Sequence, residues 1–106
     1  MFGIYSNGYD EIIKIIDECK SINKVIIYGS RAKGNFKEGS DIDLTLKGDV
    51  TADDFSNLIR RLDDSYLPYK FDISIYDDIK SESLKEHINR VGKTFYTRNT
   101  EIIQDK

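Results

Sequence analysis

Residues 28–44 read YGSRAKGNFKEGSDIDL. A β-branched apolar run leads into the turn Gly29-Ser30, and ten residues later the chain resumes as an alternating segment with carboxylates at Asp41 and Asp43. Because successive side chains of a strand point to opposite faces, the two carboxylates share one face, and the isoleucine and leucines between and after them form an apolar face. The pattern predicts a strand over 41–46 that is anchored to the core on one side only.

These residue types suit the binding of a metal ion and of phosphate. Two carboxylates on one strand face can converge on a hard cation, which prefers oxygen ligands. Gly29 allows a ligand to approach the backbone closely, and free N–H groups at a turn or helix start attract phosphate, to which Ser30 adds a hydroxyl. Arg31 is the loop cation best placed to balance triphosphate charge. Taken alone, Gly29-Ser30 is also typical of an exposed turn, and Asp41-x-Asp43 of an exposed strand edge. The prediction of a binding site therefore rests on the spacing between the two motifs.

The other predicted elements follow from hydrophobic periodicity and from capping residues. We expect a helix over Tyr9 to Lys20, a central strand over 24–28, a helical turn over 30–33, a helix after the N-cap Thr51, a strand over 70–76, a helix from the N-cap Ser81 to about Val91, and a short edge strand over 94–97. Residues 1–7 are expected to be a frayed start and residues 99–106 a polar tail.

The strand, helix and strand between residues 41 and 76 are expected to form a right-handed crossover, which makes the last strand parallel to the first. The fold class is therefore α/β (α+β): one domain over 1–106, with a small mixed sheet backed by helices on its apolar face and an open acidic face. On the last strand Asp72 alternates with apolar residues, so we interpret it as a third carboxylate of the site rather than a simple exposed acid.

Composition limits the function classes. The 106 residues carry 16 Lys and Arg against 19 Asp and Glu, a net charge of -3, which argues against stable nucleic-acid binding. No apolar run approaches the roughly 20 residues of a membrane helix, and no secretory signal is seen, so we expect a cytoplasmic protein. The single Cys19 excludes an internal disulfide and is interpreted as a buried apolar side chain.

The spacing Gly29-Ser30, ten residues, Asp41-x-Asp43 resembles the signature of the DNA polymerase β-like nucleotidyltransferase superfamily, and the small size resembles its minimal nucleotidyltransferase (MNT) branch. The resemblance implies the polymerase β-like fold and nucleotidyl transfer from ATP with two Mg²⁺ ions. It implies that Asp41, Asp43 and Asp72 are catalytic metal ligands, and that the Gly-Ser turn binds the nucleotide.

MNT proteins are commonly the antitoxins of HEPN–MNT toxin–antitoxin pairs. The resemblance therefore implies that AMP is moved onto a tyrosine of a HEPN-type ribonuclease toxin as partner. Two alternatives stay open: an adenylyltransferase for a small molecule, and a catalytically silent antitoxin-like binding module. The sequence does not specify the acceptor, the base preference, the oligomeric state, or the roles of Lys33, Lys37 and His87.

Overall fold

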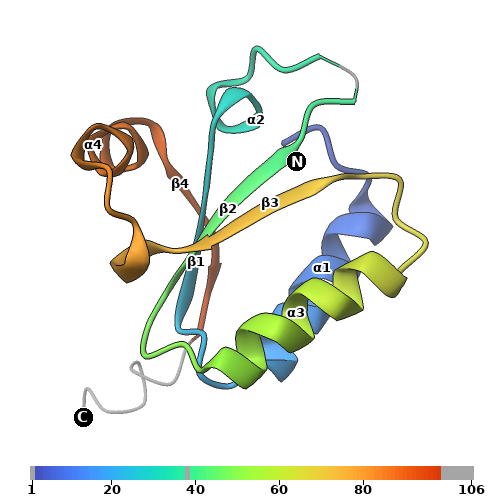
Figure 1. The fold of residues 1–106 in the computed structure, drawn as a ribbon. Coiled ribbons are helices and arrows are strands. Elements are labelled where there is room, and N and C mark those ends of the chain that lie inside the picture. The colour runs from blue at the N-terminus through green and yellow to red at the C-terminus, as the bar shows by residue number, and fades with distance from the viewer. Residues whose placement is uncertain (1, 38, 99–106) are drawn as a thin grey trace, which may run out of the picture.

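The computed structural model describes residues 2–37 and 39–98, and within them the strands form one sheet in the order β3-β2-β1-β4 (Figure 1). The strands are β1 (Lys24–Tyr28), β2 (Ile42–Lys47), β3 (Phe71–Ile75) and β4 (Lys93–Thr97). The helices are α1 (Ser6–Glu18), α2 (Ser30–Lys33), α3 (Ala52–Asp64), the 3-10 helix η1 (Tyr76–Asp78) and α4 (Glu82–Val91). β1 is antiparallel to β2 and β4, whereas β2 and β3 are parallel. The predicted mixed sheet, its central first strand and the parallel crossover are confirmed.

The main core lies between the sheet and helices α1 and α3, which cover one of its faces (Figure 1). The inward side chains of β2, namely Ile42, Leu44 and Leu46, are all 0% exposed, and Cys19 is buried as predicted. Both predicted N-caps are present, because the side chains of Thr51 and Ser81 accept hydrogen bonds from the backbone N–H groups three residues on. None of the helices in this described part of the chain is long and apolar enough to cross a membrane.

The prediction of a frayed start was wrong for the described residues 2–7. α1 begins at Ser6 rather than Tyr9, Ile4 is buried, and Phe2 packs against the core. Two apolar residues ahead of the helix therefore contribute to the packing and hold the chain against the domain. The predicted tail over 99–106 lies outside the described residues.

The expectation that all helices back the apolar face was also wrong. α4 lies on the opposite side of the sheet from α1 and α3 (Figure 1). A Cβ atom on Gly92, which follows α4, would lie 2.6 Å from Cγ2 of Ile26, a residue that points away from the main core. The reason is that β1 is apolar on both faces, so the amphipathic α4 buries Ile88 on the second face. α4 therefore covers part of the face that carries the carboxylates.

We predict that Gly92→Ala destabilises the domain by about 1–3 kcal/mol, because its methyl group would also lie 2.4 Å from the carbonyl oxygen of Ile88. Gly34→Ala is the control: its methyl group meets nothing within 4 Å, so only the cost of a positive φ of 87°, about 1 kcal/mol, is expected. Chemical denaturation measures both. A Gly92→Ala variant as stable as wild type would contradict the close packing of α4 on β1.

Candidate functional site

The sheet register aligns two of the predicted acids. Asp43 of β2 is the direct partner of Asp72 on the parallel strand β3, and on its other side it is the partner of Tyr28 on β1. One step further along, the hydroxyl of Ser74 donates a hydrogen bond of 2.9 Å to Oγ1 of Thr45. Asp43 and Asp72 therefore lie side by side on one face, on strands joined by a helix.

Asp41 lies immediately before β2 and is exposed. Its effect on Asp43 is electrostatic: the pKa of Asp43 is raised, first by burial and then by the negative charges of Asp72 and Asp41, while His87 lowers it. The ionised form of Asp43 is therefore disfavoured by its surroundings. All three predicted acids contribute to one region of negative potential.

The described residues 2–37 and 39–98 contain no group of three or more His, Cys, Asp or Glu side chains already gathered to hold a metal ion. The donor set nevertheless fits Mg²⁺, which takes oxygen ligands and is usually bound through one or two carboxylates together with substrate phosphates. A cation would also relieve the repulsion that raises the pKa of Asp43. Asp41, Asp43 and Asp72 are the residues here that can hold such an ion.

Gly29 links β1 to α2 and lies directly against Asp43. Its φ is +82°, a backbone conformation that residues other than glycine rarely adopt. An added Cβ atom would lie 2.2 Å from Oδ2 of Asp43. Ser30, the first residue of α2, is half-buried beside it. The Gly-Ser turn and the acidic strand therefore meet in space. Glycine is therefore required at position 29 for the placement of the Asp43 carboxylate.

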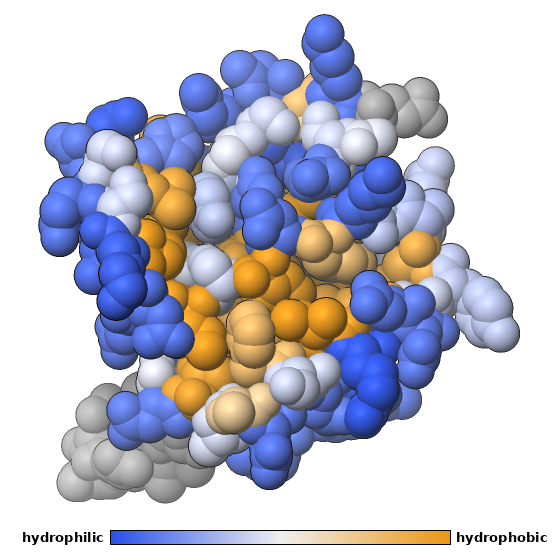
Figure 2. Space-filling view, viewed as in Figure 1, coloured by the Kyte–Doolittle hydropathy of each residue, from blue (hydrophilic) through white to orange (hydrophobic). Residues whose placement is uncertain are grey.

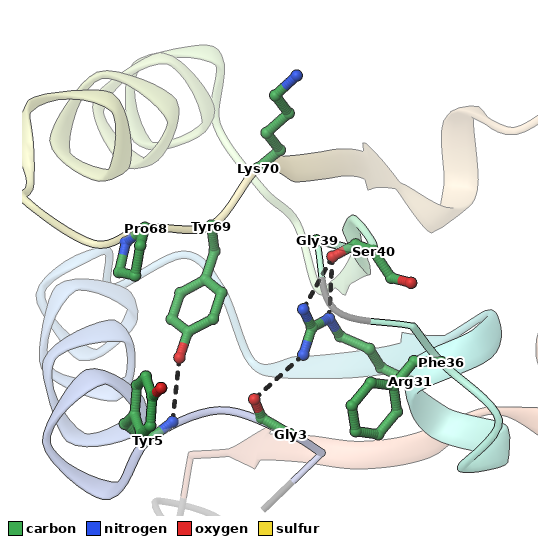
Figure 3. Close-up of a pocket in the computed structure, with 9 residues that line it drawn as sticks. All are labelled: Gly3, Tyr5, Arg31, Phe36, Gly39, Ser40, Pro68, Tyr69 and Lys70. Atoms are coloured by element: carbon green, nitrogen blue, oxygen red, sulfur yellow. Dashed lines mark hydrogen bonds between the residues drawn. The ribbon is translucent and has the colours of Figure 1, made fainter.

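Arg31 is only 4% exposed, and its guanidinium is held by backbone carbonyls (Figure 3). Nε and Nη2 donate to the carbonyl oxygen of Ser40 at 3.1 and 2.9 Å, and Nη1 donates to those of Phe2 and Gly3 at 3.1 and 3.3 Å. The group also lies 5.5 Å from the ring centroid of Tyr69. These contacts favour a structural role over the predicted contact with triphosphate. Arg31 joins the N-terminal segment to the residue that precedes Asp41.

Sequence reasoning left His87 outside the site, yet the structure brings it close. Its ring centroid lies 6.4 Å from that of Tyr28, with the rings nearly perpendicular, and its charge acts on Asp43. Only the placement of α4 on the second face of the sheet creates this proximity. The periodicity of the helix marks His87 as a border residue and carries no signal for its neighbour.

A cavity of about 490 Å³ lies beside Arg31 (Figure 3). It is bounded by the N-terminal segment, by the loop before β2 and by the entry to β3, and its charged lining residues are Arg31 and Lys70. Tyr69 lies in its wall, where its hydroxyl oxygen accepts a hydrogen bond of 3.1 Å from the backbone N–H of Tyr5. The cavity therefore adjoins the segments that lead into Asp41 and Asp72.

We predict that Asp43→Asn leaves the melting temperature unchanged or raises it at pH 7 in the presence of a chelator. A raised folded-state pKa means that Asp43 favours the fold only while it is protonated, and this contribution is lost as the pH rises through that pKa. The gain over wild type should therefore shrink toward about pH 4, the ordinary range of an aspartate. Asp49→Asn, in the exposed turn after β2, is the control for the loss of one negative charge. A clear loss of stability of Asp43→Asn at pH 7 would contradict the repulsion between Asp43 and its neighbouring acids.

We predict that Arg31→Lys lowers the free energy of unfolding by about 2 kcal/mol or more, because an ammonium cannot reach the three carbonyl oxygens at once and leaves buried acceptors unpaired. Arg60→Lys, at an exposed position of α3, is the matched control and should change stability by less than about 0.5 kcal/mol. Equal denaturation midpoints for the two variants would contradict a structural role for Arg31.

Comparison with known proteins supplies the family. The family described as "Polymerase beta, Nucleotidyltransferase" matches residues 10–101, whereas no curated protein matches the chain. A solved toxin–antitoxin structure with AMP-PNP is similar over 91% of this chain and 78% of its own, with 19% identity and a TM-score of 0.68. A mutant of the toxin–antitoxin MntA-HpeT is similar over 90% and 76%, with 22% identity and a TM-score of 0.64.

At these identities the solved structures show a shared fold alone. The family match covers most of the chain and includes the turn at Gly29 and all three aspartates. This protein therefore belongs to the polymerase beta nucleotidyltransferase family, as the spacing of its Gly-Ser and Asp-x-Asp motifs predicted, and its domain is a nucleotidyltransferase.

Proposed function

We propose that this domain transfers AMP from ATP to a hydroxyl group, with Asp41, Asp43 and Asp72 as the metal ligands. The observation that carries the proposal is the register of Asp43 beside Asp72, with Gly29 in contact with Asp43. It places a carboxylate pair next to a turn whose backbone a phosphate can approach. The proposed cofactor is Mg²⁺, as two ions.

In the proposed reaction the acceptor oxygen bonds to the α-phosphorus of ATP. The bond between the α- and β-phosphates breaks, pyrophosphate leaves with the electron pair, and the hydroxyl proton passes to solvent. Bound Mg²⁺ would neutralise phosphate charge and lower the pKa of the attacking hydroxyl. The turn at Gly29 and Ser30 would contact the terminal phosphates. Since Arg31 is already occupied by carbonyl oxygens, any contribution from it to nucleotide binding is indirect.

We propose a tyrosine of a HEPN-type ribonuclease toxin as the acceptor, and therefore an antitoxin role. The support is that two of the similar solved structures are toxin–antitoxin structures, one of them with AMP-PNP. Asp72 is exposed and shares a sheet face with Asp43, so a macromolecule can bring its own hydroxyl to it from that face. A protein acceptor fits this accessibility better than an enclosed small molecule does.

One observation favours a second function, that of a binding module that neutralises its partner by contact alone. Among the described residues no metal-binding group is already assembled, so the carboxylates would need ligand binding to gather them. The two functions differ in whether the partner gains mass.

We predict that wild-type protein, co-expressed with a HEPN-type toxin or mixed with it, ATP and Mg²⁺, adds AMP to the toxin and silences its ribonuclease activity. Asp41→Asn/Asp43→Asn should slow the transfer about 100-fold or more while partner binding persists, because charge stabilisation by the metal ion is lost. Intact-mass spectrometry of the toxin measures the transfer.

Asp77→Asn/Asp78→Asn is the control, because it removes the same number of charges from exposed positions in η1. It should transfer AMP at nearly the wild-type rate. Silencing without added mass, or silencing by the Asp41→Asn/Asp43→Asn variant at sub-stoichiometric amounts, would support the binding module instead.

A further inference from the structure

Within residues 2–37 and 39–98, the strand β3 is an edge of the sheet and pairs with β2 alone. The backbone N–H of Ile42 donates to the carbonyl of Lys70 at 2.8 Å. In a parallel pair the backbone groups of alternate residues point to the same side, so the groups of Asp72 and Ser74 also point toward β2. The N–H and C=O groups of Phe71, Ile73 and Ile75 consequently point outward, along the free edge.

An apolar surface accompanies this free edge. Phe71, Ile73 and Ile75 are only partly buried, whereas the corresponding side chains of β2 are fully buried. Ile59, Leu62 and the exposed Asp63 of α3 line a groove of about 270 Å³ together with Phe71, Asp72 and Ile73. Figure 2 shows apolar side chains gathered in the region between α3 and β3. We call this surface the β3 edge patch; edges of this kind are templates for another strand.

We propose that a second copy of this chain covers the β3 edge patch, with β3 antiparallel to β3 of the other copy about a twofold axis at Ile73. In this register Ile73 faces Ile73 of the second copy, and Phe71 faces its Ile75. All three residues have outward backbone groups, so each facing pair can exchange two hydrogen bonds. The same patch on both copies satisfies the requirement of a twofold interface.

The charges at the two ends of β3 are complementary only in this orientation. Lys70 is exposed at the start of the strand, and Asp77 and Asp78 are exposed just after its end. An antiparallel second copy brings the lysine of one chain toward the acids of the other, whereas a parallel copy would bring like charges together. The register also places Asp72 opposite the neutral Ser74 rather than opposite a second Asp72.

The twofold axis is perpendicular to the sheet, so α1 and α3 of both copies lie on the same side of it. Ile59 of α3 then faces the same shared groove, which increases the apolar area that the dimer buries. The face that carries Asp41 and Asp43 remains accessible in both copies. Dimerisation therefore does not depend on the proposed transfer reaction and does not block it.

Analytical ultracentrifugation of the wild-type chain from low to high micromolar concentration tests the proposal. A reversible dimer is expected, and Ile73→Lys should weaken it about tenfold or more, since it places a charge at the axis. Tyr66→Lys is the control, because Tyr66 is the fully exposed aromatic outside the patch; its dimer should match wild type. A monomer at every concentration, or a dimer that Ile73→Lys leaves unchanged, would overturn the proposal.

A second variant keeps the test valid if Ile73→Lys unfolds. Facing residues of an antiparallel pair have Cα atoms about 5.5 Å apart, within the range of a disulfide. Ile73→Cys should therefore cross-link to itself on mild oxidation, whereas Tyr66→Cys should not. Absence of the cross-link in folded Ile73→Cys would count against the register. Loss of toxin binding by Ile73→Lys in a monomeric protein would overturn the dimer in favour of a partner strand on the patch.

Discussion

The site depends on the parallel pairing of β2 with β3, in the register that sets Asp43 beside Asp72. The opposite face of β2 is completely buried, and a slip by one residue would turn the carboxylates into the core and the apolar side chains out of it. The packing of α1 and α3 on that face therefore holds the register. In this way the hydrophobic core determines which face of the sheet carries the acids.

The resulting arrangement is electrostatically unfavourable without a ligand. Burial and two neighbouring carboxylates raise the pKa of Asp43, and Gly29 is pressed against the same side chain. Such crowding is a usual feature of functional sites, where a group is held in a state that a ligand relieves. The repulsion between the acids lowers the stability of the fold, and the packing of the opposite sheet face offsets this loss. The negative region therefore persists in a folded domain.

Arg31 holds the loop before β2 in place, as the hydrophobic core holds the strands. A buried guanidinium that donates to the carbonyl oxygens of Phe2, Gly3 and Ser40 joins the N-terminal segment to the chain before β2. The chain just before Asp41 is thereby fixed by residues near the start of the protein. Arginine suits this role for two reasons. Its guanidinium stays charged at all relevant pH values, and it presents five donors in a rigid arrangement.

The sequence by itself determined most of the helices and strands, the mixed sheet and the sheet face shared by Asp43 and Asp72, because alternation, capping and the handedness of a crossover act over short distances along the chain. It could not show that Gly29 and His87 both lie close to Asp43. Nor could it show that the buried Arg31 donates to the carbonyl oxygens of Phe2 and Gly3. Nor could it place α4, since an amphipathic helix specifies that one face is buried and not which surface buries it. These features were decided by the tertiary structure alone, because each depends on packing between segments that are distant in the sequence.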